Sequence, residues 1–394
     1  GKELRNYLGY CKDMVNTYYT RNRYFDEVIR DYLENIHPEE WVKVDEPSES
    51  TTLVDMDFPH YRDGLMPTCK IMSQIAGLEV IGNKKNLYLT MKRHKPKSIG
   101  DYIPKTYLLD PSDTENLREI FDGRKFIVKP EDRECRKGIF VTKDYRDFCE
   151  KLKDKILKEK KEQLVKKRPP GDWIIQEYIE NPLLYEGKKF HLRPYVFLIK
   201  RNGMLNVYVY NELQMYFAGD TYKEDNPASF LSEGGEEYEK RIFPKDFYKY
   251  YGPENISYIY AQIYKIVDDT TKPLSQVIPD SGGDAYKFIA YDILIDKEYK
   301  CHLAEVNHRY IGMNYHSQYF NPCLYKNLMN VFFFPIHTDK RVEFIGTHKL
   351  GKQNVKMTKT HSRKTRRRKT GSRKTRRRKT GRRGDRRKLP EKKC

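Results

Sequence analysis

Three oxygen-bearing side chains, Asp292, Glu305 and Asn307, come from one short stretch of the sequence. The stretch predicts two strands and a turn, over residues 288–295, 301–306 and 296–300 respectively. Neighbouring strands of an antiparallel hairpin lie about 4.8 Å apart, so we expect the three side chains to meet around one point. Mg²⁺ prefers such oxygens, usually together with the phosphates of a nucleotide. The hairpin therefore predicts a Mg²⁺ site; the alternative is that these are solvated carboxylates at strand edges.

Lysine and arginine side chains lie at the end of one other predicted strand and on the face of another. Lys129 ends the apolar run 126–128 and precedes a proline, a position from which a lysine can reach a phosphate as a point charge. The alternative is a surface lysine with a buried stem. Lys189 and Arg193 are four residues apart, so they share one face of the strand expected over 189–199. Because cations on an apolar strand are costly without anions, they either pair with buried carboxylates or line a site for a phosphate or a substrate carboxylate.

The elements that must position these residues are visible in the apolar pattern. Asn202-Gly203 predicts a hairpin turn after the 189–199 strand, with alternating apolar residues on the return strand. Further strands are expected over 126–128 and 173–176, an extended segment near 104–111, and helices over 144–167 and 258–267, around 84–94, and within 307–334. Residues 18–36 also carry apolar positions at helical spacing.

The net charge of +20 is concentrated at the end of the chain. Residues 359–394 hold 20 Lys and Arg against Asp385 and Glu391, which leaves about +2 for residues 1–358. The decapeptide SRKTRRRKTG occurs at 362–371 and again at 372–381. Such a segment repels itself and cannot bury a core, so we expect it to be disordered when free and to bind polyanions.

Composition excludes several classes of protein. The seven cysteines are odd in number and scattered without CxxC spacing, which argues against a disulfide framework and a structural zinc site. No apolar run reaches the about 18 residues that span a bilayer, and no signal-peptide core is present, so we expect a cytoplasmic or nuclear protein without membrane contact. Dinucleotide, P-loop, GxSxG and HExxH motifs are missing from the sequence.

Two stretches, IIQEYIENPLLYEGKKFHLRPYVFL at 174–198 and YDILIDKEYKCHLAEVN at 291–307, resemble the tubulin-tyrosine-ligase-like family of the ATP-grasp superfamily. The likeness extends more weakly over residues 84–334. It implies an α+β ATP-grasp fold that binds ATP between two subdomains. It also implies an ATP-dependent carboxylate-amine ligase that joins an amino acid to a protein acceptor through an acyl phosphate, with Mg²⁺ as cofactor.

The resemblance also assigns roles by position. Lys129 and Arg193 would act at the reacting phosphate, and Asp292, Glu305 and Asn307 would bind Mg²⁺. The positions implied for ATP are Lys84 (or Lys85), Lys129, Gly138, Gln176, Glu177, Tyr178, Ile179, Lys189, His191 and Asp292. Of these, the backbone of Gln176 to Ile179 would receive adenine.

This chain departs from the family pattern at four places. His191 stands where an aspartate is expected, and the loop 130–138 keeps only Gly138 of a glycine-rich segment. Asn211 replaces the arginine of tyrosine-adding members, which makes glutamate a better expected donor than tyrosine or glycine. Residues 308–310 replace small residues after the hairpin.

Two hypotheses follow. In the first, a monomeric enzyme takes a free amino acid and a protein acceptor, which is tubulin or another protein with an acidic tail. In the second, a catalytically weakened relative serves as a binding module for microtubules or nucleic acid. Residues 359–394 can supply a polyanion tether, a localisation signal or a nucleic-acid contact under either hypothesis; a functionless repeat expansion is the alternative.

Four parts of the chain are expected. They are an N-terminal α/β domain over 1–100, a central ATP-grasp subdomain over 101–176, a C-terminal ATP-grasp subdomain with the metal site over 177–345, and a disordered basic tail over 346–394.

Overall fold

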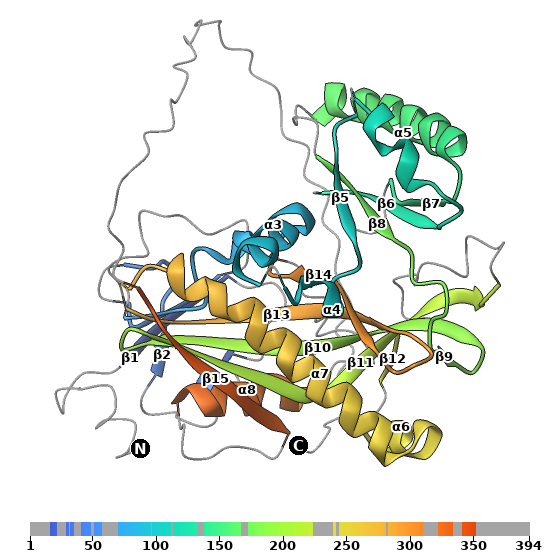
Figure 1. Cartoon of the computed structure of the whole chain (residues 1–394). Helices are drawn as coiled ribbons and strands as arrows, with labels where there is room; N and C mark the ends of the chain where they lie inside the picture. The colour runs from blue at the N-terminus through green and yellow to red at the C-terminus, as the bar shows by residue number, and fades with distance from the viewer. Residues whose placement is uncertain are drawn as a thin grey trace, which may run out of the picture. The chain divides into compact units, whose positions relative to one another are not determined.

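The structure is a computed structural model of the whole chain (Figure 1). It describes residues 16–21, 29–30, 32–34, 41–48, 51–56, 70–95, 97–111, 113–131, 138–166, 172–223, 239–241, 244–280, 283–309, 322–333 and 341–351. The expected tail at 346–394 therefore lies almost wholly outside the described residues. No helix in the described part of the chain is long and apolar enough to cross a membrane.

Eleven of the described strands form one large sheet. Its main path runs β12-β11-β10-β13-β4-β3-β1-β2, while β14, β15 and β9 pair with β13, β11 and β10. These strands are β1 (Asn16–Arg21), β2 (Trp41–Lys43), β3 (Leu53–Met56), β4 (Ile71–Met72), β9 (Leu184–Tyr185), β10 (Lys188–Arg201), β11 (Met204–Thr221), β12 (Glu239–Arg241), β13 (Asp284–Ile295), β14 (Cys301–Asn307) and β15 (Val342–Lys349). The first four strands pair in parallel, and β4 joins them in parallel to the long antiparallel strands through β13.

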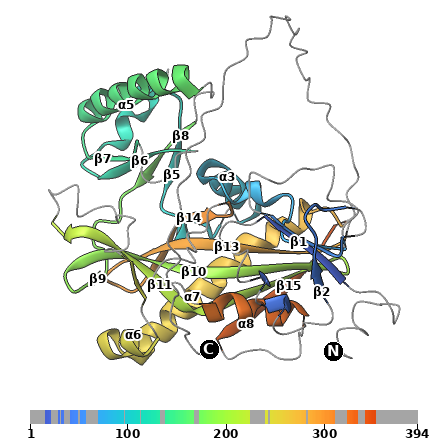
Figure 2. The ribbon, with the colours of Figure 1, turned by 180° about the vertical axis from the view of Figure 1, so that it is seen from behind.

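Alternate residues of the long strands pack into two different hydrophobic cores, one on each face of the sheet. Val196 and Leu198 of β10 pack in one cluster with the apolar stripe of α7 (Pro253–Thr271), whereas Phe197 and Ile199 pack in a second cluster with α8 (Pro322–Phe333). This is the period of two that a strand imposes, and it explains why β10 is apolar on both faces. Figures 1 and 2 show α7 on one face of the sheet and α8 on the other.

A second sheet has four described strands in the order β5-β8-β6-β7. They are β5 (Thr106–Leu109), β8 (Trp173–Glu177), β6 (Phe126–Pro130) and β7 (Phe140–Thr142). One face of this sheet packs Phe126, Val128, Trp173 and Ile175 against α5 (Tyr145–Lys166). The residues in between, including Lys129 and Gln176, belong to the other face.

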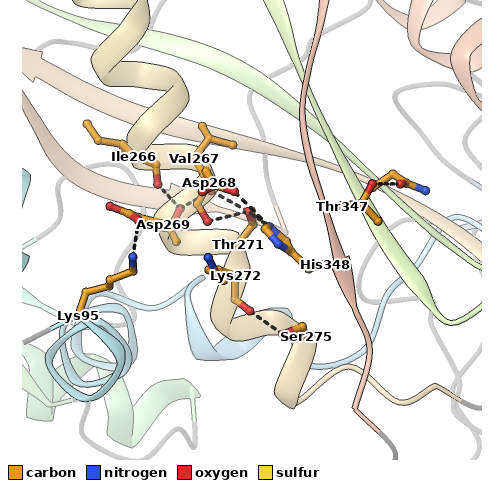
Figure 3. A network of polar contacts seen from close by, with 12 residues as sticks. Lys95, Ile266, Val267, Asp268, Asp269, Thr271, Lys272, Ser275, Thr347 and His348 are labelled. Atoms are coloured by element: carbon orange, nitrogen blue, oxygen red, sulfur yellow. Dashed lines mark hydrogen bonds and ion pairs between the residues drawn. The ribbon is translucent and has the colours of Figure 1, made fainter.

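Helix α3 (Lys84–His94) begins at the candidate site and is held at its far end. Lys95 forms an ion pair with Asp269 near the end of α7, and the Thr271 hydroxyl on the same helix lies 3.1 Å from Nε2 of His348 in β15 (Figure 3). These contacts tie α3, α7 and β15 together.

The shorter helices are α4 (Ile99–Tyr102), α6 (Pro244–Tyr251) and the 3₁₀ turns Leu78–Val80, Glu115–Ile120 and Lys272–Gln276.

The mixed α+β class and the elements around the motifs are confirmed. Both hairpins form, and the helices expected near 84–94, 144–167 and 258–267 are α3, α5 and α7. The helical spacing over residues 18–36 was misleading at its start, because Asn16–Arg21 is a parallel strand. A hydrophobic run that is buried on both faces fits either period, so pattern alone could not decide. The boundaries of the four expected parts stay predictions.

We expect Leu198→Ala to lower the free energy of unfolding by about 2–5 kcal/mol. The side chain is fully buried in β10, between β11 and β13, so truncation leaves a cavity that the sheet cannot close. Denaturant titration followed by circular dichroism measures the change. Met204→Ala at the start of β11, where 36% of the side chain is exposed, is the matched control and should cost far less. Equal losses in the two variants would contradict this account of the core.

Candidate functional site

The β13–β14 hairpin brings its polar side chains together as expected. Asp292 is the register partner of Glu305, and Ala290 is the partner of Asn307. The register shifts directly after Asp292, which marks a β-bulge at the site. Asn307 donates from Nδ2 to Asp292 Oδ2 at 3.2 Å, so its amide oxygen is the atom left for a cation.

Both carboxylates of this hairpin face cations. Arg193 donates from Nε and Nη2 to the two oxygens of Asp292 at 2.7 and 2.8 Å, a bidentate pair. Lys84 at the start of α3 lies 2.8 Å from Glu305 Oε2. Burial alone would raise the pKa of Asp292, but the charges of Arg193 and His191 and the hydrogen bonds hold it well below its usual range. The Asp292 carboxylate is therefore ionised.

His191 lies beside this ion pair. Its Nε2 atom is 3.6 Å from Asp292 Oδ1, and its ring stacks on Tyr216 with centroids 5.1 Å apart. The Arg193 guanidinium lies over the same Tyr216 ring, 4.2 Å from the centroid. Tyr216 was missed in the sequence because only the β10–β11 register, which pairs it with His191, brings it here.

Lys129 is buried and meets a neutral partner. Its Nζ donates to Oε1 of Gln176 at 2.9 Å. Burial first, and then the charge of Lys84, lower the pKa of Lys129 to about 8, while Glu305 and Asp292 act in the opposite direction. Lys129 therefore lies close enough to Glu305 and Asp292 to feel their charges, but its hydrogen bond goes to Gln176.

Lys189 has a similar environment. Its Nζ donates to the hydroxyl of Tyr178 at 2.9 Å and lies 4.3 Å from the centroid of that ring. Burial, followed by the charges of Lys129 and Lys125, lowers the pKa of Lys189 to about 7. Two buried amines with lowered pKa values in one site are a common sign of function.

Two backbone amides of the segment Gln176–Ile179 already donate hydrogen bonds within the protein. The amide of Glu177 donates to the carbonyl of Lys105, and the amide of Tyr178 donates to the carbonyl of Lys125. The Glu177 side chain pairs with Arg124 at 2.7 Å. Half-buried Ile179 follows the strand. The side chains of Gln176 and Tyr178 face Lys129 and Lys189, and the adenine contact expected of this backbone stays a prediction.

The remaining predicted positions are more peripheral. Lys85 pairs with Asp172 just before β8. Gly138 has φ of +89°, and a Cβ there would lie 3.2 Å from Cγ of Pro130, so glycine is needed for the backbone itself. Most of the loop before it, residues 132–137, lies outside the described residues. Asn211 contacts Tyr260, Tyr264 and the carbonyl of Arg341.

The donor set suits a hard cation. It offers two carboxylates and one amide oxygen, which is short of a full protein cage and leaves coordination places for phosphate and water, as Mg²⁺ prefers. Among the described residues no group of three or more His, Cys, Asp or Glu could hold a metal. The residues present therefore fit Mg²⁺ delivered with an oxyanion better than a structural metal.

The model of the tubulin-tyrosine ligase family matches residues 65–234. That range includes Lys84, Lys129, the Gln176–Ile179 segment, Lys189 and Arg193, and it ends before the hairpin that carries the carboxylates. The sequence resemblance is thus supported by an independent match.

Individual relatives agree with that match. The chain is 25% identical to a probable tubulin polyglutamylase TTLL2 of Homo sapiens over 245 residues, which is 55% of this chain and 38% of the relative. It is 24% identical to tubulin polyglutamylase TTLL6 of Mus musculus over 278 residues, or 62% and 31% of the two chains. A probable tubulin–tyrosine ligase of Schizosaccharomyces pombe is 30% identical over 147 residues, or 34% and 35%. The matched region thus spans about a third of each relative's length.

We expect Lys189→Met to stabilise the ligand-free protein by about 1–4 kcal/mol at pH 6, because it removes a charge buried against a neutral partner. An unfolded lysine titrates near 10.5 and the folded Lys189 near 7, so the unfolded chain binds more protons between these values. Wild-type stability from this group therefore rises with pH, and the advantage of the variant should shrink towards pH 9. Denaturant titrations at both pH values measure this. Lys188→Met, on the neighbouring residue, is the control; a pH-independent difference would refute the assignment.

Proposed function

We propose that this chain, which belongs to the tubulin-tyrosine ligase family, is an ATP-dependent carboxylate-amine ligase that adds an amino acid to a protein acceptor. We further propose the ATP-grasp arrangement, in which ATP binds between the four-stranded sheet and the large sheet. The observation that carries the proposal is the pairing of two kinds of group in one site. Lys84 and Arg193 contact the carboxylates of an oxygen set suited to Mg²⁺, and Lys129 and Lys189 contact neutral acceptors beside them.

Glutamate is the donor that the relatives favour. Two of the three relatives described above are named tubulin polyglutamylases. Asn211, at the position where tyrosine-adding members carry an arginine, is held by Tyr260 and Tyr264 of α7 and offers no charge for a tyrosine carboxylate. We therefore propose transfer of glutamate, with tubulin as the acceptor and the cytoplasm as the place of reaction.

The described residues divide the work of such a reaction. Lys129 and Lys189 would hold phosphate oxygens as point charges, and the nucleotide would favour their charged forms. Arg193 would exchange part of its contact with Asp292 for the γ-phosphoryl group, which would pass from ATP to the carboxylate of the amino acid and release ADP. Attack of the acceptor amine on the resulting acyl phosphate would form the amide and release phosphate and a proton. Asp292, Glu305 and Asn307 would hold Mg²⁺, which supplies charge neutralisation between phosphate oxygens. In the proposed reaction the protein would act by positioning the substrates and by neutralising charge.

A binding module with weak turnover is the second candidate, and His191 favours it. The family pattern has a carboxylate at this position, and here an imidazole lies 3.6 Å from Asp292 instead. One acceptor for a substrate ammonium or hydroxyl group is thereby lost.

Incubation with Mg-ATP, tubulin and labelled glutamate should transfer glutamate to tubulin, and intact-mass analysis should show the added residues. We expect Asp292→Asn and Glu305→Gln to lower kcat at least about 100-fold, since each removes a charge that balances the metal. Glu298→Gln is the matched control, because this carboxylate lies exposed in the turn of the same hairpin.

Two results would decide against the ligase. Nucleotide binding without transfer of glutamate, tyrosine or glycine would favour the binding module. Turnover that survives in both carboxylate variants would contradict the metal assignment.

The basic segment at 359–394 lies outside the described residues, and its composition motivates a separate proposal. Its 20 Lys and Arg residues would concentrate an acidic acceptor near the site through salt-sensitive contacts. Deletion of this segment should raise KM for the protein acceptor several-fold at low salt and leave kcat unchanged. An unchanged KM at low salt would reject the tether and leave localisation or nucleic-acid binding as its role.

A further inference from the structure

Three polar side chains form a ladder across the four-stranded sheet. Thr106 of β5 is the direct register partner of Gln176 in β8, and Lys129 lies one strand further on in β6, two residues beyond the partner of Gln176. Residues related in this way share one face of a sheet. All three are buried, with 4%, 5% and 7% of their surface exposed. The opposite face of this sheet is the apolar core under α5.

The hydrogen bonds along this ladder have a fixed direction. The Thr106 hydroxyl donates its one proton to the carbonyl of Pro104 at 2.7 Å. It can therefore only accept from Gln176, whose Nε2 lies 2.9 Å away. The carboxamide then has a single orientation, in which Oε1 faces Nζ of Lys129 at 2.9 Å. Without the Thr106 hydroxyl, the buried NH₂ group of Gln176 loses its acceptor in this orientation, so the preference for Oε1 facing the ammonium group is weakened.

We propose that Thr106 is a positioning residue for nucleotide binding: it sets the orientation of the Gln176 amide, so that Gln176 holds the Lys129 ammonium group charged and aimed at the phosphate site. The inference rests on the proposed function of Lys129 as a phosphate ligand. Its distinctive element is that Thr106 acts through Gln176 and not by contact with the ligand. A threonine two strands away from the lysine, on the far side of β8, thus influences the charge state of a residue in the site.

The surroundings of Lys129 explain why one acceptor matters so much. Burial and the charge of Lys84 in α3 oppose its protonation, and Glu305 of β14 and Asp292 of β13 favour it. Both of those carboxylates are already paired, with Lys84 and Arg193. Gln176 Oε1 is the acceptor that contacts Lys129 directly among the described residues. Turning the amide around replaces an attraction by a contact between two donors.

The first test follows the Lys129 amine itself. In protein labelled with [ε-¹³C]lysine, the Lys129 resonance is assigned by its loss in Lys129→Arg and titrated with pH in the absence of ligand. We expect a midpoint near 8 in the wild type. Thr106→Val, which keeps the shape of the side chain and removes the hydroxyl, should lower this midpoint by about one pH unit. Thr106→Ser should restore the wild-type value, because the hydroxyl and not the methyl group is required.

Two controls separate positioning from stability. Thr142→Val removes another buried threonine hydroxyl in the same sheet, one that donates to the carbonyl of Asp144 and not to the ladder, and it should leave the Lys129 midpoint unchanged. Gln176→Glu supplies a carboxylate that accepts in either orientation, so Thr106→Val should change the midpoint little in that background. A fall in the Thr142→Val variant equal to that in Thr106→Val, with both proteins folded by circular dichroism, would overturn the proposal.

The second test measures nucleotide affinity by calorimetry at pH 6 and pH 8.5. Thr106→Val should weaken binding of Mg-ATP about eightfold at pH 8.5 and scarcely at pH 6, where Lys129 is charged in both proteins. Equal weakening at both pH values would refute positioning through Gln176. Absence of nucleotide binding in the wild type would refute the proposed function alone, because the lysine titration judges the ladder without any ligand.

Discussion

The site depends on one constraint: charges that have left water must be matched. Asp292 and Arg193 are both largely buried, and their bidentate contact makes the burial of each tolerable. Glu305 and Lys84 repeat the arrangement at the edge of the same hairpin. These pairs join β10, β13, β14 and α3, so the site is held together by ion pairs between different elements. Removing one partner would leave the other charge unmatched, which costs more than removing both.

The same pairs define what a ligand has to do. A metal ion on Asp292 competes with Arg193, and a phosphate on Arg193 competes with Asp292. If both arrive together, each charge exchanges one counter-ion for another and none is left unmatched. If either arrives alone, one protein charge loses its partner. Binding of a divalent cation and of a polyphosphate should therefore be mutually favourable, and the coupling comes from the protein's own ion pairs.

The sequence predicted those elements of the site whose spacing lies within one strand or one hairpin. Asp292, Glu305 and Asn307 needed only a turn of known length, and Lys189 and Arg193 needed only the period of a strand. Tyr216 and Thr106 could not be found in this way, because a one-residue difference in register would have placed other side chains there. In β10 and β11 the register shifts near Arg193, and such bulges leave no clear signal in composition. Of residues 18–36, those described at 29–30 and 32–34 are helical as expected, and only the strand Asn16–Arg21, buried on both faces, was not predicted.

The cations of the site have two kinds of partner, carboxylates and neutral acceptors, and the two kinds have different effects on the charge of the cation. Arg193 and Lys84 face carboxylates, and the raised pKa of Arg193 keeps that group charged, whereas Lys129 and Lys189 face a carboxamide and a phenol. A neutral acceptor satisfies one N–H bond without cancelling the charge, so the field of each ammonium group remains available to an incoming anion. Because these two ammonium groups are buried without a paired carboxylate, the pKa values of Lys129 and Lys189 fall to about 8 and about 7. An anionic ligand would reverse that shift and draw protons into the site, so under the proposed function the neutral acceptors would contribute to the affinity for phosphate as well as to the fold.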